Sequence, residues 1–202
     1  MNWAVGLTFA ATIVLVGAEW SHSRIRYFAK PLASAGFVTV GILALDLDAI
    51  YGVTILAGLM LGAAGDVALL GRSDRNFMIG LGAFLAGHIA LTIGFVSEAS
   101  TTVIPGVLVA IVFSAVAWRW LGPHVAGTLR TPVIAYVAVI TLMLAAALGA
   151  APSHPLAAIG GSAFVASDLA VARDRFVSPG IGNRLWGLPL YYLGQVLIAL
   201  SG

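Results

Sequence analysis

The stretch YGVTILAGLMLGAAGDVALL, residues 51–70, is apolar over the length of a membrane-spanning helix, yet it contains one aspartate, Asp66. A helix needs about 20 apolar residues to cross the hydrocarbon core of a bilayer. The run is continuously apolar and does not alternate as a barrel strand does, so it predicts a spanning helix. A carboxyl group inside such a helix is costly unless it meets a partner or a water-filled cavity. Asp66 therefore calls for a functional explanation.

The whole chain resembles this stretch in composition. Of its 202 residues, 60% are hydrophobic and only 9% are charged, and the mean hydropathy is +1.03. This excludes a soluble domain and predicts an all-α polytopic membrane protein. Residues 1–202 are expected to form a single transmembrane domain. Eight apolar runs are long enough to span the bilayer: 3–19, 31–47, 51–71, 77–97, 103–120, 131–150, 155–173 and 183–201.

The basic residues predict the orientation of these helices. All ten Lys and Arg residues fall in or beside the connections after the first, third, fifth and seventh runs: Arg24, Arg26, Lys30, Arg72, Arg75, Arg119, Arg130, Arg173, Arg175 and Arg184. The opposite turns carry Asp46, Asp48 and Glu98 and no basic residue. The positive-inside rule makes the basic side cytoplasmic, so both termini are expected outside. The first run has no basic segment before it, which argues against a cleaved signal peptide. A bacterial-type inner membrane is the expected location.

Two segments of the sequence resemble one another. GDVALLGRSDRNF (65–77) and SDLAVARDRF (167–176) both place a small residue before an aspartate, then an apolar stretch, a basic segment and a phenylalanine. Both end odd-numbered helices, which would fit a parallel repeat of four helices plus four. Chance similarity in such low-complexity sequence would explain the pattern equally well.

Few ionisable residues lie inside the apolar runs. Asp66 lies six residues before Arg72 and Asp168 five before Arg173, so both carboxyls are expected roughly 8–9 Å inside the cytoplasmic edge. Glycines precede each aspartate at helical spacing, which favours a face packed against other helices. His88, in the fourth run, is the third deep ionisable residue. The last run adds Tyr191, Tyr192 and Gln195, so one cavity could collect all six side chains.

Each of these residues also has a purely structural interpretation. A single aspartate could hydrogen-bond a neighbouring helix, and His88 or the tyrosines could be packing residues. Lys30 could be a positive-inside charge that extends toward the interface, and Glu19 is expected to pair with a basic residue of the first connection. Only His88 among the histidines lies within a span, so a zinc site is not expected. Nucleophile and phosphate-loop motifs are also missing. Carboxylate acid–base chemistry without a cofactor remains, with one carboxyl protonated and the other ionised.

Five segments in order resemble the YhhN/TMEM86 family of lysoplasmalogenases: KPLASA (30–35), LMLGAAGDVALL (59–70), FMIGLGAFLAGHIALTIGF (77–95), FVASDLAVARDRF (164–176) and LPLYYLGQVLIALS (188–201). The resemblance implies an eight-helix enzyme that hydrolyses the vinyl ether bond of lysoplasmalogens to a fatty aldehyde and a glycerophospho head group. Its matched polar residues are Lys30, Asp66, His88, Asp168, Tyr191, Tyr192 and Gln195. One departure is Leu91, where the family often has a tyrosine, whose role Tyr136 could supply.

From this resemblance we expect Asp66 and Asp168 to divide the acid and base roles in either order. His88, Tyr192 and Gln195 would position water or substrate oxygens, and Lys30 would attract the head-group phosphate. The expected partners are a lysophospholipid and membrane lipids. Nucleic acid is not expected at a net charge of +2, and no oligomeric state is assigned. The alternative is a proton-coupled transporter or a binding protein for a lipid or small solute, in which the aspartates relay protons.

Overall fold

The computed structural model describes residues 1–71, 73–99 and 103–202, and in these residues the regular structure is helical throughout. Eight α-helices follow one another along the chain: α1 (Asn2–Trp20), α2 (Arg26–Ala44), α3 (Ile50–Ala68), α4 (Asp74–Ser97), α5 (Val103–Leu121), α6 (Arg130–Gly149), α7 (Pro155–Ala172) and α8 (Ile181–Ala199). They lie close to the eight predicted runs. Arg72, one of the basic residues used to predict orientation, lies outside the described residues.

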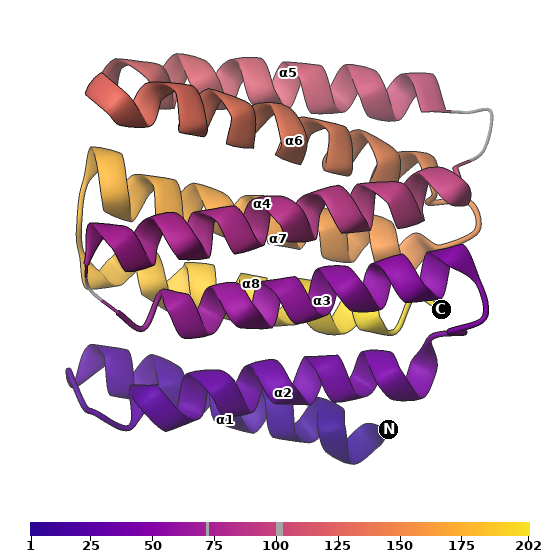
Figure 1. Cartoon of the computed structure of the whole chain (residues 1–202), viewed down its shortest axis with the longest axis horizontal. Coiled ribbons are helices and arrows are strands. Elements are labelled where there is room, and N and C mark those ends of the chain that lie inside the picture. The colour runs from indigo at the N-terminus through magenta and orange to yellow at the C-terminus, as the bar shows by residue number, and fades with distance from the viewer. Residues whose placement is uncertain (72, 100–102) are drawn as a thin grey trace.

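The helices pack side by side with their axes roughly parallel (Figure 1). α5 and α6 form one edge, α1 and α2 form the other, and α3, α4, α7 and α8 lie between them. The C-terminal helix α8 packs against α7, α1 and α2 and also reaches α3. Both chain termini lie at the same end of the bundle. This arrangement brings α2, α3, α7 and α8 around a common interior.

Glycines allow the central helices to approach closely. A Cβ on Gly160 of α7 would lie 2.8 Å from the carbonyl oxygen of Gly194 on α8, and a Cβ on Gly58 of α3 would lie 3.2 Å from that of Gly87 on α4. Small residues at such crossings let backbones come together where a larger side chain would separate them. The glycines expected to mark packed faces are therefore found at the α3–α4 and α7–α8 contacts.

Seven of the described helices, all but α8, are long and apolar enough to cross a membrane. The chain is thus a multi-pass integral membrane protein. α8 is as long as α1 but carries Asn183, Arg184, Pro189 and Gln195, which make it more polar. That α8 also spans the bilayer, that the termini lie outside, and that the chain is a repeat of four helices plus four stay predictions.

Ion pairs connect the helices at the end where the basic residues gather. The Glu19 carboxylate lies 3.8 Å from Arg26, which confirms the predicted partner in the first connection. It lies closer, at 2.7 Å, to Arg184 at the start of α8. At the other end His154 stacks on Tyr51, with ring centroids 4.3 Å apart, and its Nδ1 donates to the carbonyl oxygen of Ser201. Both ends are therefore fastened by polar contacts.

Candidate active site

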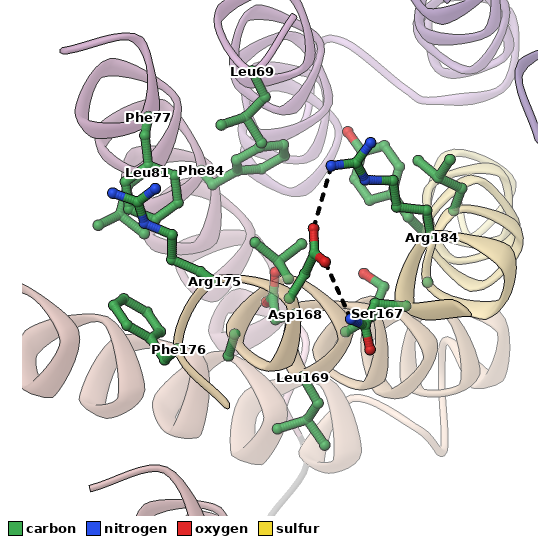
Figure 2. A pocket seen from close by; sticks show the side chains of 18 of the residues that line it. Leu69, Phe77, Leu81, Phe84, Ser167, Asp168, Leu169, Arg175, Phe176 and Arg184 are labelled. Carbon is green, nitrogen blue, oxygen red and sulfur yellow. Dashed lines mark hydrogen bonds and ion pairs between the residues drawn. The ribbon is translucent and has the colours of Figure 1, made fainter. Parts of the chain in front are cut away.

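A cavity of about 760 Å³ lies at the end of the bundle where the basic residues gather. Apolar side chains of α4, α6 and α7 form much of its wall, including Leu81, Phe84, Val137, Ile140 and Phe164. The polar residues that line it from within the helices include Lys30, Asp66, Tyr136, Asp168 and Tyr191. Figure 2 shows Asp168 on the cavity floor formed by α7, with Phe84 of α4 facing it. The cavity thus combines an apolar wall with a few buried ionisable groups.

Asp66 is held by two side chains of α2. The Lys30 ammonium lies 3.2 Å from its Oδ1 atom, and the Ser34 hydroxyl donates to its Oδ2 atom at 2.7 Å. Lys30 and Ser34 are one helical turn apart, so they face α3 together. All three residues are buried, Asp66 at 2% exposure. Asp66 and Lys30 therefore have the geometry of a buried ion pair.

Tyr192 of α8 extends this group. Its hydroxyl donates to the carbonyl oxygen of Lys30 at 3.3 Å and lies 3.5 Å from the Ser34 hydroxyl. The Tyr192 side chain is fully buried. It therefore fixes the start of α2 against α8 and stands behind the Lys30–Asp66 pair, away from the cavity wall.

Asp168 has different partners. His88 Nε2 of α4 lies 3.1 Å from its Oδ2 atom, and the Tyr136 hydroxyl of α6 donates to its Oδ1 atom at 3.2 Å. His88 is fully buried and stacks on Phe164, with ring centroids 4.3 Å apart. Its Nδ1 atom lies 2.7 Å from the carbonyl oxygen of Phe84. Three helices thus converge on this carboxyl group.

The contact of His88 with Phe84 determines where protons lie. A carbonyl oxygen can only accept, so Nδ1 of His88 must carry a hydrogen. In a neutral imidazole Nε2 would then be a bare acceptor facing the Asp168 oxygen, and two lone pairs would oppose one another. The pair is at ion-pair distance, although its angle falls outside hydrogen-bond geometry. The contact is favourable only with one proton more, on His88 or on Asp168.

Tyr191 and Gln195 carry buried polar groups that are open to a ligand or a water. Within the described residues, the Tyr191 hydroxyl and both atoms of the Gln195 amide are buried and make no hydrogen bond. Both lie over Gly62 of α3, since a Cβ there would be 3.2 Å from the Tyr191 hydroxyl and 3.6 Å from the Gln195 nitrogen. Tyr191 is also close enough to Asp66 and Asp168 to interact with both electrostatically. Its hydroxyl is therefore within electrostatic range of both carboxyl groups.

The structure places all seven of the expected residues in or beside this cavity. Lys30, Asp66, Asp168 and Tyr191 line it, whereas the side chains of His88, Tyr192 and Gln195 support them from behind. The two aspartates, which we expected to divide the acid and base roles, have separate partners. Tyr136, named above as a possible replacement for the family tyrosine at the position of Leu91, contacts Asp168. Ser34 was not singled out, although its position one turn after Lys30 could have indicated it.

Within the described residues, no group of three or more His, Cys, Asp or Glu side chains is placed to hold a metal ion. The chemical groups that this site offers are two carboxyls, an imidazole, an ammonium and phenols. They can transfer protons and stabilise a positive charge next to an apolar channel.

Comparisons with known proteins agree on one group of relatives. The sequence model of the YhhN family matches residues 25–202. The chain is 31% identical over 155 residues to "Lysoplasmalogenase TMEM86A" of Bos taurus, which covers 73% of the chain and 64% of that relative. It is 29% identical over 145 residues to "Lysoplasmalogenase" of Mycobacterium bovis, covering 68% of the chain and 54% of the relative. The matched part therefore spans somewhat over half the length of these relatives. No solved structure shows significant similarity to the chain.

Proposed function

We propose, from the premise that this chain belongs to the YhhN family, that it is a membrane hydrolase that cleaves the vinyl ether bond of lysoplasmalogens. Relatives in cattle and in mycobacteria are named lysoplasmalogenase. The observation that carries the mechanism is the His88–Asp168 contact, which requires one extra proton. The Lys30-bound carboxylate of Asp66 lines the same cavity.

The reaction needs a proton donor first. Hydrolysis of a vinyl ether begins with protonation of the alkene carbon that lies beyond the ether-bearing carbon, and this gives an oxocarbenium ion. The His88–Asp168 pair supplies this proton. In addition to the proton that His88 Nδ1 donates to Phe84, the pair carries one on either Nε2 of His88 or Oδ2 of Asp168, and this second proton can be transferred. Tyr136 keeps the Asp168 carboxyl in place during the transfer.

The oxocarbenium ion then needs a negative charge and a nucleophile. Asp66 is the ionised carboxylate of the site and stabilises the cation from the α3 side of the cavity. Water adds to the cationic carbon and gives its proton to Asp66, which produces a neutral hemiacetal. The Tyr191 hydroxyl and the Gln195 amide, which make no hydrogen bond to the part of the chain that the structure describes, are suited to orient this water.

Collapse of the hemiacetal restores both carboxyl groups. The hemiacetal hydroxyl returns its proton to Asp168 as the carbonyl forms, and the departing glycerol oxygen takes the proton that Asp66 holds. The products are a fatty aldehyde and a glycerophospho head group, and the sum of the steps consumes one water. No other co-reactant is required.

The test is aldehyde release from lysoplasmenylethanolamine by the purified protein, with Asp168→Asn, Asp66→Asn and wild type compared. We expect both substitutions to reduce kcat by roughly 10²–10⁴-fold, as for loss of a general acid or base. Asp74→Asn is the matched control, because Asp74 pairs with Arg175 on the surface and its side chain is 86% exposed.

Two results would contradict the proposal. Full aldehyde release by both the Asp168→Asn and Asp66→Asn variants would exclude the proton-transfer roles. Release of fatty acid from acyl lysolipids, with no aldehyde from vinyl ethers, would exclude the substrate class. Proton-coupled flux into liposomes without product formation would favour a transporter.

A further inference from the structure

The outer part of the cavity is lined by charged residues that the proposed chemistry does not use. They come from the end of α1, the α1–α2 connection, the start of α2, the segment before α8 and the start of α8: Glu19, His22, Arg26, Asp174 and Arg184. We call this group the cavity mouth. Figure 2 shows Arg184 extending from α8 into the pocket that Asp168 also lines.

Glu19 fixes two guanidinium groups at the cavity mouth. Its side chain is only 11% exposed, and its carboxylate lies 2.7 Å from Arg184 Nη1 and 3.8 Å from Arg26 Nη1. Glu19 and Asp174 together balance the two guanidinium charges, because Arg184 also pairs with Asp174. A ligand that carries one negative and one positive group can therefore replace the Arg184–Asp174 contact without leaving a charge unpaired, and a guanidinium already oriented by Glu19 on one edge can bind the anionic group with its other edge.

The second contact of Arg184 is weaker. Its Nη2 atom lies 3.4 Å from Asp174 Oδ2, and the Arg184 side chain is 44% exposed. Asp174 is held independently, because its Oδ1 atom accepts from the Gly180 amide at 2.8 Å and from the Asn183 side chain at 3.1 Å. An exposed, long ion pair contributes little stability. A ligand can therefore separate Arg184 from Asp174 without moving either backbone.

We infer that Arg184 and Asp174 form the subsite for a zwitterionic phosphodiester head group. The phosphate binds the Nη2 side of Arg184 beside Arg26, in place of Asp174, and a primary ammonium group binds the released Asp174 Oδ2. This inference rests on the proposed function and names the part of the substrate that the cavity mouth recognises. Lys30, expected from the sequence to attract the phosphate, lies deeper in the site, 3.2 Å from Asp66.

The position of the subsite fits the length of the substrate. Arg184, Leu188 and Tyr191 all line the cavity and recur on one face of α8. Seven residues of helix rise, about 10 Å, separate Arg184 from Tyr191. The glycerol backbone that joins the phosphate to the vinyl ether, added to the length by which the Arg184 side chain extends into the cavity, can span this distance. The hydrocarbon chain then lies along the apolar wall of α4, α6 and α7.

The chemistry of the cavity mouth favours a primary amine over a quaternary one. Quaternary ammonium groups are recognised mainly by aromatic faces. The Phe77 ring, which also lines the cavity, has the Arg175 guanidinium 4.5 Å from its centroid. A carboxylate oxygen such as Asp174 Oδ2 offers a hydrogen bond that only an N–H group can use.

The test compares two substrates that differ only in the head group. Lysoplasmenylethanolamine carries the phosphodiester, and 1-O-alkenylglycerol does not. For Arg184→Gln we expect KM for the phospholipid to rise by about tenfold or more, with KM for the alkenylglycerol within about twofold of wild type. Arg119→Gln is the matched control, since Arg119 is exposed near the same end of the bundle and does not line the cavity.

Asp174→Asn tests the ammonium contact separately. Wild type should prefer a phosphoethanolamine head group over phosphoethanol, and Asp174→Asn should lose that preference. If Arg184→Gln raises KM equally for both substrates of the first test, the phosphate assignment is overturned, because a folding defect alone would have that effect. An unchanged preference in Asp174→Asn would overturn the ammonium assignment. Absence of aldehyde from every vinyl ether with wild type would instead refute the proposed function.

Discussion

At the scale of single residues, Tyr136 orients Asp168. Its hydroxyl donates to Oδ1 at 3.2 Å, while His88 occupies the side of Oδ2. Tyr136→Phe removes this donor without removing the ring that packs against His88. Because the carboxyl group then rotates more freely, we expect kcat for aldehyde release to fall by about tenfold, with KM little changed.

Tyr51→Phe is the matched control for that substitution. It also removes one buried phenol hydroxyl, here bonded to Ser201 at 2.6 Å, but at the opposite end of the bundle. It should reduce thermal stability in detergent and leave kcat unaltered. Equal kinetic effects of the two substitutions would show that Tyr136 acts only through the fold.

The residues of the site were partly predictable from sequence. Counting residues from the basic connections placed Asp66 and Asp168 at one depth, and both line one cavity. The count could not assign partners, because Lys30 meets Asp66 from α2 and His88 meets Asp168 from α4. Such pairs depend on how helices rotate against one another, which helix periodicity alone does not determine.

At the scale of helices, the α7–α8 contact sets the position of Asp168. A Cβ on Gly160 would lie 2.8 Å from the Gly194 oxygen and 2.9 Å from the backbone nitrogen of Ile198. Backbone atoms cannot move aside cheaply, so Gly160→Ala must push the helices apart. We expect a loss of about 1–3 kcal/mol in stability and reduced aldehyde release, because Asp168 lies two turns further along α7.

Gly82→Ala provides the comparison for Gly160→Ala. Gly82 lies on α4, and a Cβ there would meet no atom within 4 Å. Thermal denaturation in detergent should show this variant to be as stable as wild type or slightly more so, because alanine favours helix. Equal stability of Gly160→Ala and wild type would mean that the α7–α8 contact can relax.

The helices themselves follow from the sequence more directly than their contacts do. Long apolar runs predicted α1 to α7, because a bilayer leaves the backbone few alternatives to a helix. α8 is a helix of about the expected length but is less apolar, because it carries residues such as Arg184 and Gln195. Arg184 lines the cavity and Gln195 is buried against other helices, so neither has to face lipid. Composition measures polarity along a helix, and only packing shows which polar side chains avoid lipid.

At the scale of the whole molecule, the uneven distribution of charge predicts one orientation in the membrane. The basic residues gather at one end, which includes the α7–α8 connection, and the α2–α3 connection at the other end holds only acidic charges. The positive-inside rule places the basic end, and with it the cavity mouth, in the cytoplasm. A head-group product would then be released to the cytoplasm, and a fatty aldehyde would partition into the bilayer.

This orientation can be measured with single cysteines, because the chain has none of its own. Leu47 in the α2–α3 connection and Ser178 in the α7–α8 connection are both exposed. In intact bacterial cells a membrane-impermeant maleimide should label Leu47→Cys, and it should label Ser178→Cys only after the membrane is broken. The reverse pattern would place the cavity mouth outside the cell. Labelling of both cysteines in intact cells would contradict the placement of these two connections on opposite faces, and with it the spanning of the bilayer by the helices between them.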